Sequence, residues 1–304
     1  MGILSALSDA RRRALLRVRL AGANRAYEVY SRRLRANGTE PSMTNVISQL
    51  ATHAQVESDT YREWVARLRL PLIRHRKYWE FSFIMQALAE HDMLRAGRSG
   101  LGFGVGKEPL TAMMASLGCN VLASDASAEH AIAAGWKNND EHASGLEGLN
   151  EAGICSNAAF AERARFRVID MNHIPADVRG FDFCWSSCAF EHLGSIDQGL
   201  AFVESSLDCV VPGGLAVHTT EFNLSSDERT VERGETVLFR RRDVERLAQR
   251  LRASGHRVDV NYHPGYGELD RHVDVPPYQR NRHVKLMVAR FVTTSFGLIV
   301  QKAG

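Results

Sequence analysis

The sequence predicts an α/β fold: a doubly wound, mostly parallel sheet preceded by an α-helical N-terminal extension. From about residue 97 onward, short β-favouring runs alternate with helical patterns, which is typical of a parallel sheet with helices on both faces. A glycine-rich turn joins the first of these runs to the first helix. The composition of the 304 residues, 44% hydrophobic and 24% charged, is that of a globular protein rather than a disordered or fibrous one.

Residues 1–96 are predicted to form an all-helical extension ahead of the sheet. The first segment places Leu15, Leu16 and Leu20 among nine arginines, which is typical of an amphipathic helix with a basic face, and it ends at Asn37-Gly38. Such a face is either solvated or in contact with an anionic surface such as a membrane, and solvation is the commoner case.

Two further helical patterns complete the extension. Apolar residues recur at helical spacing around Trp64 and Leu68, and again from Tyr78 to Leu88. The aromatic cluster within residues 78–81 is interpreted as core packing, with closure over a bound ligand as the alternative.

Residues 97–304 are predicted to form the sheet domain. Seven strands are expected, at residues 98–102, 120–124, 165–169, 181–186, 214–220, 257–262 and 284–301. The last is expected to break near Thr293 to Ser295. Helices are expected after Pro109, from Ser127, around 196–209, and from Asp243 to Ala253.

Charge and cysteine usage exclude several classes of protein. Residues 1–77 carry a net charge of +9 and the remainder −6, so the sheet domain is mildly acidic and nucleic acid is not its obvious partner. No stretch reaches the roughly 18 uninterrupted apolar residues of a membrane span, and the first residues lack the apolar core of a secretory signal, so a cytoplasmic protein is expected. The five cysteines lie scattered in apolar contexts and are expected to be buried reduced thiols, neither disulfides nor a zinc site.

The motif with the strongest link to chemistry is Gly-Leu-Gly-Phe-Gly-Val-Gly at residues 100–106, between a predicted strand and a predicted helix. Glycine lets the backbone turn tightly and approach a ligand closely. Asp125 ends the second predicted strand, 19 residues after Gly106, where a carboxylate can accept hydrogen bonds from both ribose hydroxyls of a nucleoside. A helix N-cap ahead of Ser127 is the alternative for Asp125. Together the two features predict a nucleoside cofactor site.

On these residues the chain resembles the class I S-adenosylmethionine-dependent methyltransferases, from about Gly97 to the C-terminus. Residues 165–175 look like the third-strand motif of that family, residues 181–193 like the fourth, and residues 207–217 like the fifth. Residues 284–301 would supply the reversed strand that distinguishes this sheet from a dinucleotide-binding one. The resemblance implies a Rossmann-like seven-stranded sheet, S-adenosyl-L-methionine as the cofactor, and methyl transfer as the activity.

The resemblance also implies which residues contact the cofactor. They are Gly102, Gly104, Gly106, Asp125, Ala126, Asp170, Met171 and Ser186. Asp170 is expected at the adenine amino group and Met171 on the face of the adenine ring. The sequence departs from the family where many members carry an acid on the first strand, because this chain has Gly100 there. Another group must then hold the methionine end of the cofactor, and Glu108 is one candidate.

Methyl transfer from a sulfonium mainly requires alignment of the reacting atoms, and it needs a general base only where the acceptor is protonated, as a sugar hydroxyl is. The resemblance places His192 at the methionine end, so His192 is the expected base and Glu191 is expected to orient it or to polarise the acceptor. The alternative is that this pair simply begins a helix. His218, Glu221 and Asn223 follow the fifth strand, where they either face the acceptor or cap the strand end. No metal is expected.

The sequence therefore predicts a methyltransferase that acts on a small molecule or on a sugar of a glycan or glycolipid, with oxygen as the expected acceptor atom. A nicotinamide-dependent oxidoreductase is one alternative, although Pro212-Gly213-Gly214 and the C-terminal strand pattern argue against it. A protein that binds S-adenosylmethionine without turnover is a second alternative. Nucleic acid methylation, suggested by the basic N-terminus, is a third.

Overall fold

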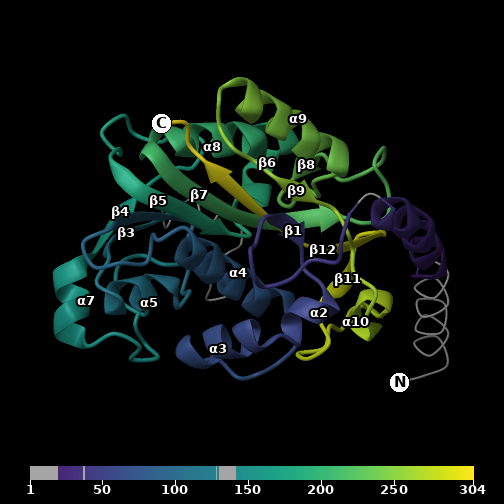
Figure 1. Cartoon of the computed structure of the whole chain (residues 1–304), viewed down its shortest axis with the longest axis horizontal. Helices are drawn as coiled ribbons and strands as arrows, with labels where there is room; N and C mark the ends of the chain where they lie inside the picture. The colour runs from purple at the N-terminus through teal and green to yellow at the C-terminus, as the bar shows by residue number, and fades with distance from the viewer. Residues whose placement is uncertain (1–19, 37, 128, 130–141) are drawn as a thin grey trace, which may run out of the picture.

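The computed structural model describes residues 20–304 except residues 37, 128 and 130–141. A single large sheet crosses this part of the molecule (Figure 1). Eight of its strands follow one another in space as β4 (Ala164–Val168), β3 (Asn120–Asp125), β2 (Ser99–Phe103), β5 (Phe181–Ser187), β7 (Val210–Asn223), β12 (Phe291–Gln301), β11 (Lys285–Val288) and β10 (Val273–Asp274). The predicted doubly wound α/β fold is confirmed, but the sheet has ten strands among the described residues instead of the predicted seven, because short strands extend it.

The direction of β12 sets this sheet apart from an all-parallel one. The pairs among β4, β3, β2, β5 and β7 are parallel. β12 lies antiparallel between β7 and β11. The predicted break of the last strand at 293–295 was wrong: the turn lies at Ala289, whose φ of 54° ends β11, and Arg290 follows it before β12 begins. A left-handed backbone at one residue makes the tight reversal that an apolar pattern alone does not reveal.

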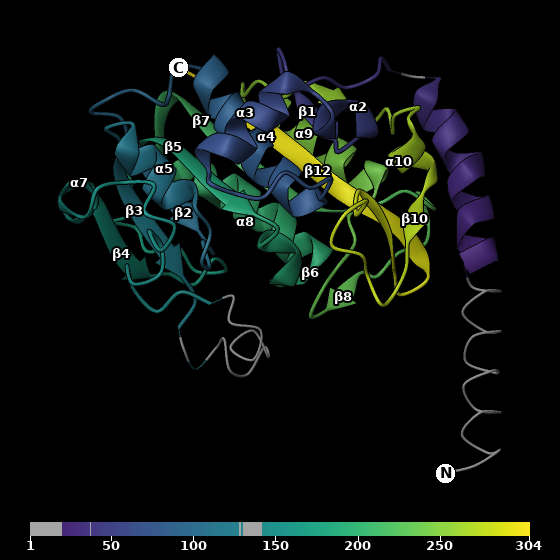
Figure 2. The same ribbon diagram turned by 90° about the horizontal axis from the view of Figure 1, so that it is seen from below.

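Helices cover both faces of the sheet (Figures 1 and 2). α8 (Ile196–Asp208) and α9 (Arg241–Ala253) lie on one face, and α4 (Arg76–Glu90) and α5 (Leu110–Ser116) on the other. Local capping explains where two of these helices begin. Ser195 accepts a hydrogen bond from the amide of Gln198 at the start of α8, and the His75 imidazole accepts one from the amide of Lys77 at the start of α4.

The N-terminal extension is helical except for one strand that the sequence analysis missed. Residues 20–35 are helical, and α2 (His53–Val56) and α3 (Asp59–Arg67) follow before α4. Just before α2, the strand β1 (Ser48–Leu50) pairs antiparallel with β12 and parallel with β9 (Val260–Asn261), so the extension contributes to the main sheet. The three residues Ser-Gln-Leu carry too little hydrophobic pattern to predict a strand.

The remaining elements are short. They are α7 (Asn157–Arg163), the 3₁₀ turn η2 (Phe190–His192), α10 (Glu268–Arg271), and a small ribbon of β6 (Gly194–Ser195) and β8 (Arg233–Gly234). Most of the predicted arginine-rich first helix and most of the predicted helix from Ser127 lie outside the described residues. In the part of the chain that is described, no helix is both long and apolar enough to cross a membrane.

Aromatic side chains fill the core on both sides of the sheet. Trp79 and Phe83 of α4 are fully buried and stack on each other with ring centroids 4.9 Å apart, which confirms that the aromatic cluster at 78–81 is largely core. On the other side, Phe222 and Phe296 pair across β7 and β12. The burial of Trp79 and Phe83 fixes the start of α4 against the sheet.

Close packing between β2 and β5 requires glycine at two positions of β2. A Cβ at Gly100 would lie 2.4 Å from two ring carbons of Phe183, and a Cβ at Gly102 would lie 2.4 Å from the ring of Trp185. Both rings are fully buried and rigidly packed. The ring of Phe183 therefore fills the space that a side chain at position 100 would need.

This packing predicts that an acid cannot be restored at Gly100. The Gly100→Asp variant should lose about 3 kcal/mol or more of unfolding free energy, because the side chain overlaps Phe183 and its charge is buried. Urea denaturation followed by circular dichroism measures the loss. Gly145→Ala is the control, since a Cβ there meets nothing within 4 Å. An unchanged midpoint for Gly100→Asp would contradict this account.

Candidate functional site

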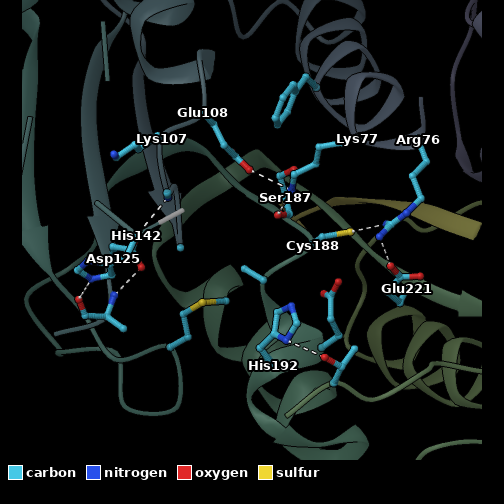
Figure 3. A pocket seen from close by; sticks show the side chains of 18 of the residues that line it. Arg76, Lys77, Lys107, Glu108, Asp125, His142, Ser187, Cys188, His192 and Glu221 are labelled. Atoms are coloured by element: carbon cyan, nitrogen blue, oxygen red, sulfur yellow. Dashed lines mark hydrogen bonds and ion pairs between the residues drawn. The ribbon is translucent and has the colours of Figure 1, made fainter. Parts of the chain in front are cut away.

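A cavity of about 890 Å³ opens at the carboxyl ends of the central parallel strands (Figure 3). Gly104 from the loop after β2, Asp125 at the end of β3 and Ser187 at the end of β5 line it, and Glu221 of β7 lines its far side. Open α/β sheets bind ligands at this edge, because the strand order reverses there and the connections diverge.

Asp125 ties the glycine loop to the end of β3. Its Oδ2 accepts hydrogen bonds from the amides of Gly106, at 3.0 Å, and Ala143, at 3.1 Å, and its Oδ1 accepts one from the amide of Ala126, at 2.8 Å. Burial raises the pKa of Asp125, and the amides of Ala143 and Ala126 act in the opposite direction. A carboxylate oxygen can accept two hydrogen bonds, so Oδ1 retains capacity for a hydroxyl of a ligand.

The glycine loop approaches the next wall of the cavity closely. Gly104 has a φ of 57°, and a Cβ there would lie 2.8 Å from the Cβ of Ala189 and 3.4 Å from the sulfur of Met171. A side chain at this position would thus fill the space between the loop and that wall. The bare backbone at Gly104 leaves this space open to a ligand.

Six of the eight predicted cofactor-binding residues meet in the cavity lining. They are Gly104, Gly106, Asp125, Ala126, Asp170 and Met171. Gly102 and Ser186 do not line it: Gly102 packs against Trp185, and Ser186 is buried with its hydroxyl 2.9 Å from Nδ1 of His218. The structure therefore brings together the glycine loop, Asp125 and the third-strand motif.

A buried carboxylate, Glu80, organises the start of α4 beside the cavity. Its Oε1 accepts from Nη1 of Arg76 and the thiol of Cys188, both at 3.1 Å, and from the hydroxyl of Ser295. Its Oε2 lies 3.3 Å from Nζ of Lys77 and 3.2 Å from the hydroxyl of Ser187. Burial alone would raise the pKa of Glu80, but Lys77 and Arg76 hold it at about 2. Glu80 thus remains ionised and orients two cations.

Glu108 places an acid beside the glycine loop. Its Oε1 lies 3.4 Å from Nζ of Lys77, and its Oε2 is buried with no hydrogen-bond partner among the described residues. Burial raises the pKa of Glu108 to about 8, with Lys77 acting against the increase (Figure 3). A buried acceptor without a partner is costly unless a ligand satisfies it.

Glu221 and Cys188 lie on the far side of the cavity. Glu221 forms an ion pair with Arg76, its second carboxylate oxygen is buried without a partner in the described structure, and burial raises its pKa against the effect of Arg76. Burial, together with Glu191 and Glu80, raises the pKa of Cys188 well above that of a free thiol. Cys188 is therefore a protonated hydrogen-bond donor rather than a nucleophile. The other four cysteines are buried free thiols, as predicted.

The predicted catalytic pair, Glu191 and His192, lines the cavity from η2. Glu191 is buried and its Oε2 accepts a hydrogen bond from the hydroxyl of Thr220 at 3.1 Å. Nδ1 of His192 lies 2.7 Å from the carbonyl oxygen of Glu235, so this nitrogen donates and carries the proton. Each member of the pair thus has a separate hydrogen-bond partner.

The three residues expected after the fifth strand have different roles. Only Glu221 reaches the cavity. His218 is fully buried between the hydroxyls of Ser186 and Ser206, at 2.9 and 3.1 Å, and burial lowers its pKa to about 3, so it is a neutral structural residue. Asn223 holds the following loop through the carbonyl of Arg229 and the amide of Ser225.

Sequence reasoning missed the cavity wall formed by the start of α4 and the segment before β11. Arg76, Lys77 and Glu80 come from the first five residues of a helix that the sequence showed only as an apolar pattern. His75 and His283 stand 208 positions apart and are joined by two backbone hydrogen bonds, from the amide of Arg76 to the carbonyl of His283 and from the amide of His283 to the carbonyl of Arg74. The Arg76–Glu80 spacing was a signal for a helical ion pair, but nothing indicated its neighbours.

Comparison with known proteins identifies the domain around this cavity. Residues 101–218 match the family model of a methyltransferase domain. No curated protein matches the chain by sequence.

Solved structures that resemble this one include three methyltransferases. A putative sarcosine dimethylglycine methyltransferase from Galdieria sulphuraria is 16% identical, covers 73% of this chain and 84% of its own, and has a TM-score of 0.46. The magnesium protoporphyrin IX methyltransferase of Synechocystis PCC 6803, solved with bound SAM, is 10% identical over 81% of this chain and 86% of its own, at a TM-score of 0.44. An S-adenosylmethionine-dependent methyltransferase from Clostridium acetobutylicum is 14% identical, covers 76% of this chain and 93% of its own, and has a TM-score of 0.41.

The matched segment runs from β2 into β7 and contains the glycine loop, Asp125, Asp170 and His192. Beyond it, the antiparallel β12 lies between β7 and β11, in the place expected for the reversed strand of this family. S-adenosylmethionine is accordingly the cofactor of this domain. Residues 101–218 therefore form a methyltransferase domain of the class I S-adenosylmethionine-dependent type.

Proposed function

We propose that the protein transfers a methyl group from S-adenosylmethionine to a hydroxyl of a small molecule or of a sugar in a glycan or glycolipid, and that it does so in the cytoplasm. The observation that supports this proposal most is one cavity in which Asp125, the open glycine loop and a set of buried ionisable groups meet. Asp125 lies on one side of the cavity, and Arg76 and Glu221 lie on the other (Figure 3). Cofactor and acceptor would thus share one enclosed space.

The residues present fit the cofactor. Oδ1 of Asp125 has capacity for a ribose hydroxyl, Gly104 leaves the backbone open, and Met171 offers an apolar face for the adenine. When bound, S-adenosylmethionine supplies an activated methyl on a sulfonium, so the chain needs chiefly to align the acceptor and exclude water. The roles of Asp170 at the adenine amino group and of His192 and Glu191 in catalysis stay predictions.

Glu108 is the acid that we propose for the methionine end of the cofactor. Phe183 excludes an acid at Gly100, whereas the buried and unpartnered Oε2 of Glu108 lies beside the same loop. Lys77, 3.4 Å from Oε1, adds a cation for the carboxylate of the ligand. An ammonium group placed against Glu108 would favour its ionised form.

The first prediction concerns the ribose. Asp125→Ala should weaken binding of both S-adenosylhomocysteine and methylthioadenosine by about 10- to 100-fold, because both carry the ribose and each lost charged hydrogen bond is worth about 1.5–3 kcal/mol. Titration calorimetry measures both affinities, and Asp59→Asn, a 90% exposed side chain, is the control. Unchanged affinity in a folded Asp125→Ala variant would remove Asp125 from the site. Binding of a nicotinamide dinucleotide instead would overturn the proposed function.

The second prediction separates the methionine end from the nucleoside. Glu108→Gln should weaken S-adenosylhomocysteine about tenfold and leave methylthioadenosine unchanged, since the latter lacks the amino acid portion. At pH 7 the raised pKa keeps Glu108 protonated before binding, so the ammonium group should displace a proton from the wild type. Calorimetry in phosphate and in Tris detects that proton by the difference in heat. Equal weakening of both ligands by Glu108→Gln would contradict the assignment.

A further inference from the structure

Two stacked imidazoles, His75 and His283, form part of the cavity wall. Their ring centroids lie 4.6 Å apart with an interplanar angle of 25°. The ring of Tyr278 meets His283 edge-on at 5.1 Å, and its hydroxyl donates to the carbonyl of Met287 at 2.8 Å. All three side chains line the cavity, and none belongs to the segment that matches the methyltransferase domain.

Fixed partners give the two rings opposite tautomers. Nδ1 of His75 lies 3.1 Å from the amide of Lys77, and an amide can only donate, so this nitrogen accepts and the proton of neutral His75 is on Nε2. Nδ1 of His283 lies 2.6 Å from Oδ2 of Asp274, and a carboxylate can only accept, so His283 carries its proton on Nδ1. Asp274 is held in turn by the amide of Gln279 at 2.9 Å.

The other nitrogen of each ring is available to a ligand. Among the described residues, the hydrogen bonds of both imidazoles are made by Nδ1, and both rings line the cavity. One ring therefore offers a donor to the cavity and the other offers a lone pair. A hydroxyl is both donor and acceptor, so it can satisfy both nitrogens, whereas an ammonium group, which only donates, matches one of them.

Burial keeps both rings neutral near pH 7. Burial lowers the pKa of His75 to about 4, with smaller contributions from His283 and Arg76. Burial also lowers the pKa of His283, and the hydrogen bond with Asp274 acts in the opposite direction. Arg76 lowers the pKa of His283 further, while Glu80, on the same helix, raises it. Neutral imidazole is the form that can take a proton.

We propose that His75 and His283 bind the hydroxyl of the acceptor, and that His283, oriented by Asp274, removes its proton as the oxygen takes the methyl group. The inference rests on the proposed methyl transfer to oxygen. The proton passes from the hydroxyl to Nε2 of His283, the oxygen forms the new bond to carbon, and the carbon–sulfur bond breaks with its electron pair going to sulfur. His283 is then a cation that Asp274 stabilises through Nδ1, and His75 donates to the oxygen and positions it.

The arrangement is tested first without an acceptor. Long-range ¹H–¹⁵N spectra of the ¹⁵N-histidine protein with S-adenosylhomocysteine, assigned with His75→Gln and His283→Gln, should show at pH 7 a proton on Nε2 of His75 and on Nδ1 of His283. The reverse tautomer at either ring would overturn the proposal. Calorimetry on the same samples separates this failure from that of the proposed function, because a protein that binds no sulfur nucleoside fails at the cofactor.

The chemistry is tested next with methyl-labelled S-adenosylmethionine and a panel of small alcohols, phenols, amines and thiols. A methyl ether supports the proposal, and an N-methyl or S-methyl product overturns it. With an accepted alcohol, His283→Gln should lower kcat by about 100-fold or more with an unchanged KM for S-adenosylmethionine. The kcat of the wild type should fall as the pH drops through the lowered pKa of His283, because the base becomes protonated.

Two comparisons identify the base. Asp274→Asn should also lower kcat, because the ring loses its orienting carboxylate, and this variant should keep its affinity for S-adenosylhomocysteine. His91→Gln, at the opposite end of α4 from the cavity, is the matched control. A large loss of kcat in His192→Gln together with normal turnover in His283→Gln would assign the proton to His192 and overturn the proposal.

Discussion

The cavity depends on one fully buried carboxylate, that of Glu80. It accepts hydrogen bonds from groups on three elements: the cations of α4, the end of β5 at Ser187 and Cys188, and Ser295 on β12. Leaving a buried charge unpaired is costly, so the position of α4 relative to the sheet is tightly constrained. Because Arg76, Lys77 and the N-cap residue His75 all begin this helix, the same constraint places a cation near the glycine loop and an imidazole in the cavity wall.

Core packing between β2 and β5 then decides where an acid can stand. The ring of Phe183 fills the space next to Gly100, so a carboxylate near the glycine loop must come from another element. Glu108 comes from the residues before α5. Burial gives it an unusually high pKa for an acid, although Lys77 lies beside it and acts against the increase.

The two ends of the cavity differ in how their polar groups are held. At the glycine loop, backbone amides satisfy Asp125, and such a site is set by loop conformation. At the far end, side chains from separated segments fix one another: a backbone amide sets His75, Asp274 sets His283, and the parallel bridge between their backbones keeps the rings stacked. Rings locked in this way lose little entropy on binding, which favours precise placement of an acceptor.

The sequence by itself determined where the parallel strands lie along the chain, and it determined the glycine loop and Asp125, since these depend on local periodicity and on residue types that a turn or strand end requires. It also predicted strand residues over 284–301, although not the turn at Ala289 that separates β11 from β12. Only the tertiary structure decided which polar residues share the cavity. His218 and Ser186 became buried partners of each other, whereas His75 and His283 met across the sheet edge. Such meetings depend on long-range backbone pairing and on the desolvation of charges, and neither is encoded in the spacing of residues along the chain.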